Sequence, residues 1–352
     1  MLVMNMIKRK CTKQIQVGNV LIGGGAPISV QSMCNTDTRD VNKTVNQIKE
    51  LSDVGCELVR IAIPDMKAAE NVDKIKAGSA IPIIADIHFD YRLALECMER
   101  GIDGLRINPG NIKETEKVKT IVEKARSKNI PIRIGVNAGS IDETKYGSPT
   151  PEALVASALD HIQILENLNY YNIKVSLKAH NVETMVAAYR LMSEQRDYPL
   201  HLGVTEAGTL FQATVKSAMG IGACLLDGIG DTIRVSVTGD PIDEIKIGRE
   251  ILKSLKLKSG PEIVSCPTCG RCEVDIITLA NQVEERLKSI DKDISVAVMG
   301  CAVNGPGEAK HCDIGLAGGK NGRFVLIKKG EIIDRIDQTQ ALDRLMQEIE
   351  KL

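Results

Sequence analysis

The chain has 352 residues, of which 43% are hydrophobic and 26% are charged, a composition typical of a globular protein with room for a barrel and a smaller domain. Its formal net charge of −1 excludes the bulk basic field that nucleic-acid-binding proteins carry. No stretch reaches the roughly 18 uncharged apolar residues that span a bilayer. Because the start of the chain also lacks the apolar segment of a signal peptide, the sequence predicts a cytoplasmic protein that binds neither nucleic acid nor a membrane.

Eight short apolar segments alternate with amphipathic segments over the first two-thirds of the chain. We expect strands at residues 26–32, 58–63, 81–88, 104–108, 130–137, 173–178, 200–206 and 232–237. Segments between them have the period of helices, among them residues 44–54, 91–100, 114–128 and 151–167. Apolar strands that alternate with helices indicate a parallel sheet covered by helices, and eight such units favour a (β/α)8 TIM barrel over an open sheet.

The last third of the chain has a different pattern. A helix at residues 241–255 completes the eighth unit, and the polar, Gly-Pro-containing segment 256–262 is typical of a linker. Beyond it we expect a helix at 274–289, a strand at 294–299, a hairpin within 324–336 and a helix from about residue 340. The sequence therefore predicts an α/β chain with a TIM-barrel domain at residues 1–258 and a small α+β domain at residues 259–352.

Basic residues stand among the β-branched residues of the predicted strands, where apolar side chains are expected. They are Arg60, Arg106, Arg133, Lys178 and Arg234. A buried charge costs several kcal/mol unless it is paired, so these residues either pair with carboxylates such as Asp86 and Glu206 or bind an anion. Because the functional ends of barrel strands meet at one face, we favour an anionic ligand, and the planar arginine fork suits a diphosphate.

The cysteines of the small domain indicate a metal site, because cysteines in a reducing compartment rarely form disulfides. The repeat offers Cys266, Cys269 and Cys272, and a later Gly/Pro-rich segment offers Cys301, Glu308 and Cys312. This spacing favours an iron–sulfur cluster over zinc, because zinc ribbons use two paired Cys-x-x-Cys units or Cys/His pairs. The spacing alone leaves open which four groups bind.

Several motifs in chain order resemble those of the 4-hydroxy-3-methylbut-2-enyl diphosphate synthase family, in its bacterial two-domain form. They include Ala26-Pro-Ile-Ser-Val-Gln-Ser-Met33, Arg106-Ile-Asn-Pro-Gly-Asn111, Gly230-Asp-Thr-Ile-Arg-Val-Ser236, Ser265-Cys-Pro-Thr-Cys-Gly-Arg271 and Gly300-Cys-Ala-Val-Asn-Gly-Pro-Gly-Glu308. The match covers nearly the whole chain. It implies an oxidoreductase of isoprenoid biosynthesis that opens the ring of 2-C-methyl-D-erythritol 2,4-cyclodiphosphate and removes a hydroxyl as water, giving (E)-4-hydroxy-3-methylbut-2-enyl diphosphate.

The resemblance also assigns roles to residues and partners. It implies that two electrons pass from flavodoxin or ferredoxin through a 4Fe–4S cluster held by Cys266, Cys269, Cys301 and Glu308. Glu206 maps to the acid that delivers a proton. The substrate-binding residues map to Arg60, Asp86, His88, Arg106, Arg133, Asn137, Lys178, Thr205, Arg234 and Ser236. The family further implies a homodimer whose active site is shared between subunits.

Two other classes of protein fit parts of the pattern. One is a barrel aldolase or phosphate-sugar isomerase with a structural zinc, in which Lys178 forms a Schiff base. The other is a non-catalytic iron–sulfur sensor whose arginines only pair with carboxylates. Within the family assignment, Cys272 and Cys312 depart from the expected pattern, since either thiol can replace Glu308 as the fourth ligand and leave no labile iron.

Overall fold

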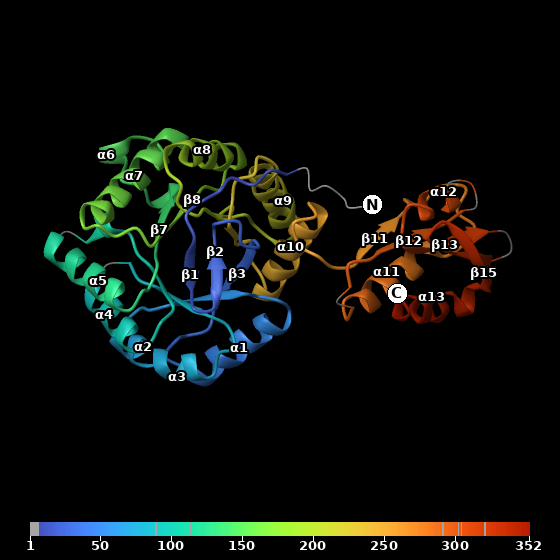
Figure 1. Ribbon diagram of the computed structural model, residues 1–352, viewed down its shortest axis with the longest axis horizontal. Helices are drawn as coiled ribbons and strands as arrows, with labels where there is room; N and C mark the ends of the chain where they lie inside the picture. Colours follow the sequence, from blue (N-terminus) through green and yellow to red (C-terminus); the bar gives the residue numbers. More distant parts are fainter. Residues whose placement is uncertain are drawn as a thin grey trace. The chain divides into compact units, whose positions relative to one another are not determined.

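The computed structural model describes residues 7–88, 90–112, 114–290, 292–301, 303, 305–319 and 322–352. The chain divides into two compact units, Met1–Leu257 and Lys258–Leu352 (Figure 1). The sequence-based division after residue 258 falls beside this boundary. Each unit has its own cluster of buried apolar side chains.

Eight parallel strands form the sheet of the first unit, and helices surround them (Figure 1). They are β3 (Ser29–Met33), β4 (Leu58–Ala62), β5 (Ile83–Asp86), β6 (Gly104–Arg106), β7 (Ile132–Asn137), β8 (Ile173–Lys178), β9 (His201–Leu202) and β10 (Thr232–Ile233). Their order is β8-β7-β6-β5-β4-β3-β10-β9, and a parallel bridge from Val175 of β8 to Leu200, beside β9, brings the two edges together. The predicted TIM barrel is confirmed.

The last two barrel strands are shorter than the predicted segments 200–206 and 232–237. After two residues each, their backbones leave the regular ladder. The irregular backbone that follows carries Thr205, Glu206, Arg234 and Ser236, four residues assigned to the site. The polar residues at these strand ends therefore lie in loops, although the sequence predicted that both strands continue through them.

Helices follow the strands in the expected alternation. The unit contains α1 (Val41–Asp53), α2 (Met66–Glu70), α3 (Val72–Ala77), α4 (Tyr91–Glu99), α5 (Thr115–Ser127), α6 (Glu143–Tyr146), α7 (Pro151–Asn167), α8 (Val182–Gln195), α9 (Leu210–Leu226) and α10 (Pro241–Ser254). Side-chain caps begin many of them; the Thr150 hydroxyl, for example, accepts a hydrogen bond from the Ala153 N–H of α7. None of the helices in the described ranges has the length and apolarity needed to cross a membrane.

A short hairpin that the sequence did not predict precedes the barrel. It pairs β1 (Ile15–Val17) with β2 (Val20–Ile22), and Ile15, Val17 and Ile22 pack on Leu58 and Ile84 of the barrel strands. Three residues per strand are too few for a period of two to be recognised. Because Leu58 begins β4, the hairpin covers the amino-terminal end of the barrel with apolar side chains and leaves the carboxyl end for polar ones.

The second unit is a five-stranded mixed sheet with helices on both faces. Its strands run in the order β11 (Glu262–Ser265), β12 (Ser295–Met299), β13 (Ile314–Gly319), β14 (Arg323–Lys328) and β15 (Glu331–Asp337), parallel up to β13 and antiparallel after it. Val296 and Val298 of β12 share an apolar cluster with Leu345 of α13 (Ala341–Glu350) and with residues of α11 (Ile276–Leu287). The alternate residues of β12 pack with Ala309 of α12 (Gly305–Ala309).

Two strands of this sheet were not predicted from the sequence. β11 begins at Glu262, the last residue of the predicted linker, and β13 contains Gly315, Gly318 and Gly319. A Cβ atom on Gly315 would lie 2.5 Å from the Cβ of Ala297 in β12, so glycine is needed there for the two strands to approach. The glycines are thus a packing requirement of a central strand.

Candidate active site

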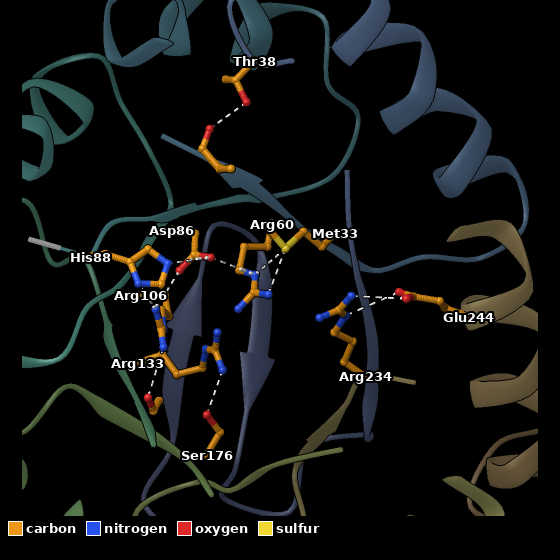
Figure 2. Close-up of polar contacts among 12 residues, drawn as sticks. Met33, Thr38, Arg60, Asp86, His88, Arg106, Arg133, Ser176, Arg234 and Glu244 are labelled. Atoms are coloured by element: carbon orange, nitrogen blue, oxygen red, sulfur yellow. Dashed lines mark hydrogen bonds and ion pairs between the residues drawn. The ribbon is translucent and has the colours of Figure 1, made fainter. Parts of the chain in front are cut away.

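The carboxyl-terminal part of the barrel interior is filled by basic side chains. Four guanidinium groups converge there from separate strands or their ends (Figure 2), and Lys178 joins them at the end of β8. The set, here called the cation cluster, consists of Arg60, Arg106, Arg133, Lys178 and Arg234. Arg106, Arg133 and Lys178 are each exposed by 5% or less. The structure therefore brings all five predicted anion-binding residues into one barrel.

Strand register explains this convergence. In the parallel ladders Arg60 lies opposite Met33, and Arg106 lies opposite Asp86 on one side and Arg133 on the other. Two positions without a Cβ make room for the long side chains. A Cβ on Gly135 would lie 2.9 Å from Nε of Arg106, and one on Gly203 would lie 2.9 Å from Nζ of Lys178.

Two carboxylates pair with part of the cation cluster. Asp86 accepts a hydrogen bond from Nη1 of Arg106 at 3.3 Å and lies 3.8 Å from Nε of Arg60. Glu244 of α10 accepts from Nη2 of Arg234 at 3.2 Å and from the Ser32 hydroxyl at 2.7 Å. The expected pairing with Asp86 is thus present.

The expected pairing with Glu206 is not found in the described part of the chain, where Glu206 is exposed and forms no ion pair. Glu244 supplies the second carboxylate, and sequence reasoning missed it. The sequence feature that could have identified Glu244 lies in α10, where Glu244 is on the same buried face of the helix as Ile245, Gly248 and Ile251. An acid on the apolar stripe of an amphipathic helix indicates a buried partner.

The cation cluster keeps a net positive charge after this pairing. Five basic side chains face the carboxylates of Asp86 and Glu244, so the formal charge of the group is +3 when all five are protonated. Arg133 donates to the neutral hydroxyl of Ser176 at 2.8 Å, and its Nε and Nη2 atoms have no partner within the described ranges. Charge and hydrogen-bond donors therefore remain for an anionic ligand.

Burial and mutual repulsion shift the protonation equilibria of the cation cluster. Burial lowers the pKa of Arg60 to about 10, and neighbouring cations add to the effect. Burial likewise holds the pKa of Arg133 and of Lys178 well below their ordinary values. For Asp86 burial acts in the raising direction, but Arg60, His88 and Arg106 outweigh it and hold its pKa below its ordinary value. A bound anion would relieve the repulsion among the cations.

Polar residues form a rim around the cation cluster. His88 is exposed, and its ring nitrogens lie 3.2 Å from Nη1 of Arg106. Asn137, Thr205 and Ser236 are half-buried at or beyond the ends of β7, β9 and β10. Glu206 has a backbone φ of 53°, a left-handed conformation that non-glycine residues seldom adopt and that is often found at functional sites.

The predicted metal ligands lie in the second unit. Cys266 follows β11 and Cys301 lies just beyond β12, the adjacent parallel strand, and Sγ of Cys266 accepts a hydrogen bond from the Gly300 N–H at 3.2 Å. Cys269 lies in an exposed segment, and Glu308 is exposed on α12. No set of three or more His, Cys, Asp or Glu side chains in the described residues is arranged to hold a metal ion.

The two additional cysteines have other contacts. The Cys272 thiol donates to the Val274 carbonyl at 3.2 Å, and its sulfur would lie 2.5 Å from a Cβ on Gly300. Cys312 is buried with Ala297 and Ala309 under α12. Both thiols therefore make packing contacts within the second unit.

These features define a class of protein: a TIM-barrel protein with a cluster of basic side chains at the carboxyl ends of its strands and a separate cysteine-bearing domain. Family models agree with both parts, since residues 12–249 match the GcpE TIM-barrel domain and residues 262–351 match the GcpE protein C-terminal domain. The chain belongs to the GcpE family. The family predicted from the sequence motifs is confirmed, and with it the prediction of an enzyme.

Curated relatives match over nearly their whole length. A protein of Geobacter sulfurreducens is 58% identical over 345 residues, which cover 97% of this chain and 98% of the relative. One of Clostridium perfringens is 55% identical over 350 residues, covering 98% of this chain and all of the relative. Both are named 4-hydroxy-3-methylbut-2-en-1-yl diphosphate synthase (flavodoxin).

Solved structures support the barrel fold alone. The dihydropteroate synthase of Yersinia pestis superposes with a TM-score of 0.52 at 11% identity and covers 69% of this chain and 97% of its own. The N-acetylneuraminic acid synthetase of Leptospira borgpetersenii gives the same TM-score at 13% identity, covering 78% and 96%. Such low identities carry no argument about chemistry.

Replacing Asp86 by Asn should lower the free energy of unfolding at pH 7 by about 3 kcal/mol, because Arg60 and Arg106 would lose their buried counter-charge. The folded-state pKa of Asp86 is depressed, so its stabilisation is present above its unfolded pKa of about 4 and is lost as the pH falls below it. Urea unfolding of both proteins between pH 7 and pH 3 measures this.

The difference between wild type and the Asp86→Asn variant should therefore shrink on acidification. Asp197→Asn is the matched control, because Asp197 forms an exposed ion pair with Lys10 and should change stability by less than about 0.5 kcal/mol. A difference for Asp86→Asn that stays constant down to pH 3 would show that its ionised form contributes no stability.

Proposed function

We propose that this chain forms 4-hydroxy-3-methylbut-2-en-1-yl diphosphate, the product for which its relatives are named, from 2-C-methyl-D-erythritol 2,4-cyclodiphosphate. The observation that carries the proposal is the excess of positive charge in the cation cluster, at the end of the barrel where such enzymes bind substrates. A cyclic diphosphate matches this charge and the planar geometry of several guanidinium groups.

The barrel residues take three roles in this proposal. The cation cluster binds the diphosphate, and Ser236 assists it. Asp86 and His88 orient Arg106, and Asn137 and Thr205 line the pocket. Support comes from the contacts among Asp86, His88 and the arginines, and from the Nε and Nη2 donors of Arg133, which have no partner among the described residues. The aldolase alternative, with Lys178 as a Schiff base, finds no support in the names of the relatives.

The second unit is proposed to hold a 4Fe–4S cluster through Cys266, Cys269, Cys301 and Glu308. The donor set fits this cofactor, since three thiolates suit iron and two of them follow adjacent parallel strands. When bound, the cluster would supply the two electrons of the reaction, and a carboxylate ligand would hold one iron less firmly than a thiolate does. Flavodoxin, which the names of the relatives give, is the proposed electron donor; the cytoplasmic location stays a prediction.

Loss of a hydroxyl group as water requires a proton, and Glu206 is the proposed source. Its carboxylate is exposed at the rim of the barrel, and its Oε1 lies 3.7 Å from the position that a Cβ on Gly139 would take, in the loop after β7. The left-handed backbone at Glu206 costs free energy that a glycine or asparagine would avoid. A glutamate kept in such a conformation favours a chemical role.

Anaerobic protein given iron and sulfide should convert the cyclodiphosphate with reduced flavodoxin, whereas the Glu206→Gln variant should turn over about 100-fold more slowly. Substrate affinity should change little, because the amide keeps the shape of the side chain. Product formation and calorimetric binding measure the two effects.

Glu183→Gln, on the exposed start of α8, is the matched control and should leave turnover unchanged. Near-normal turnover of the Glu206→Gln variant would remove Glu206 from proton transfer. Absence of product with wild-type protein that contains iron and sulfide would contradict the proposed function.

Serine variants of the cysteines should separate ligands from packing residues. Cys266→Ser and Cys301→Ser should lose most bound iron and sulfide, because serine is a poor iron ligand, whereas Cys272→Ser should retain them. Iron and sulfide analysis with electron paramagnetic resonance provides the measurement. A Cys272→Ser protein without a cluster would contradict the ligand assignment, and zinc in place of iron would favour a structural metal.

The homodimer with an active site shared between subunits remains a proposal drawn from the family resemblance. We expect a mixture of an Arg133→Ala subunit and a Cys266→Ser subunit to regain about a quarter to a half of wild-type turnover if barrel and cluster domain act across subunits. Each variant alone should be inactive. A mixture that stays inactive after subunit exchange would indicate that each chain works by itself.

A further inference from the structure

The arginines of the cation cluster differ in the partners that orient them. Arg106 and Arg234 are hydrogen-bonded to carboxylates, those of Asp86 and Glu244. Arg60 is held by the sulfur of Met33, and Arg133 by the hydroxyl of Ser176. Two guanidinium groups are thus hydrogen-bonded to carboxylates and two to neutral groups, and Arg60 in addition lies 3.8 Å from Asp86.

Among the described residues, Met33 is the nearest hydrogen-bond or ion-pair partner of Arg60. Sδ of Met33 lies 2.8 Å from Nη2 and 3.2 Å from Nε of Arg60, whereas the nearest oxygen of Asp86 lies 3.8 Å from Nε (Figure 2). The two residues are partners in the parallel register of β3 and β4, so the strands themselves set this contact. Asp86 also forms an ion pair with Arg106, so the charge of this one carboxylate is shared between two cations.

A thioether differs from a carboxylate in what it does to a cation. It is a weak hydrogen-bond acceptor that carries no charge, so it fixes the direction of the guanidinium group without neutralising it. Glu244 shows the opposite arrangement, since its carboxylate compensates Arg234 at 3.2 Å. Positive charge that remains for a ligand is therefore greatest on Arg133 and Lys178, and part of it remains on Arg60, which shares Asp86 with Arg106.

We propose that Met33 is a positioning residue of the active site, which holds Arg60 in place for the diphosphate while leaving its positive charge to the ligand. The inference rests on the proposed function and deepens it, because it assigns part of the selectivity for a highly charged anion to a neutral side chain. Ser176 has the same relation to Arg133.

A packing role is the rival explanation, since methionine often fills irregular spaces. The two explanations predict opposite orders for two variants of similar size. Leucine keeps an apolar side chain but has no acceptor, and glutamine keeps an acceptor of similar reach but is polar. If Met33 acts as an acceptor, Met33→Gln should function better than Met33→Leu; if it only packs, the order is reversed.

Calorimetric titration of the full-length protein with inorganic pyrophosphate tests this without requiring turnover. We expect Met33→Leu to weaken binding about fivefold, as loss of one weak acceptor implies, and Met33→Gln to bind within about twofold of wild type. Met33→Glu should weaken binding more than about tenfold, because its carboxylate would compensate Arg60. With the cyclodiphosphate, Met33→Leu should raise KM and leave kcat within about twofold.

Met219→Leu is the matched control, because Met219 is 59% exposed on α9 and should bind pyrophosphate as wild type does. Wild-type affinity in Met33→Leu, together with weaker binding by Met33→Gln, would overturn the inference. If the Met33→Leu variant folds poorly, the comparison of Met33→Gln with Met33→Glu tests the inference instead. Equal pyrophosphate affinities of these two variants would overturn the inference. Wild-type protein that neither binds pyrophosphate nor forms product would instead contradict the proposed function.

Discussion

Uncompensated positive charge inside a barrel is the constraint on which the rest of the first unit depends. Burying five cations against the carboxylates of Asp86 and Glu244 opposes folding, and burial lowers the pKa of Arg60, Arg133 and Lys178. The surrounding structure offsets this cost through the large apolar cluster between strands and helices and through the hairpin that covers the amino-terminal end. An anion that relieves the repulsion would stabilise the folded state as it binds.

In the second unit, the sheet places thiols from distant parts of the chain at the ends of neighbouring strands. Parallel pairing of β11 with β12 places the residues that follow each strand side by side, and the hydrogen bond from Gly300 to Cys266 links the two segments. Cys272 packs against Gly300 and so supports the same junction. Regular spacing of Cys266, Cys269 and Cys272 is therefore compatible with different roles for the three residues, as metal ligands or as packing residues.

The barrel was predictable because short apolar segments alternate with amphipathic helices, a pattern that local sequence reveals. Convergence of the basic residues followed from their positions near strand ends. The contribution of Glu244 did not follow, since a helix supplies it across the barrel wall. Glu206, which the less favoured alternative of carboxylate pairing named, forms no ion pair in the described part of the chain. β13 was missed because its glycines reflect tight contact with a neighbouring strand, which only the folded structure supplies.

The backbone of Glu206 has a consequence for the evolution and engineering of this protein. Its φ of 53° is easy for glycine or asparagine, so either replacement would make the folded chain more stable by about 1 kcal/mol. A selection for heat resistance alone would therefore favour removing the very carboxylate proposed to deliver the proton. At position 206 the residue that gives the more stable fold differs from the residue that the proposed reaction needs. Any selection for stability must therefore also select for activity.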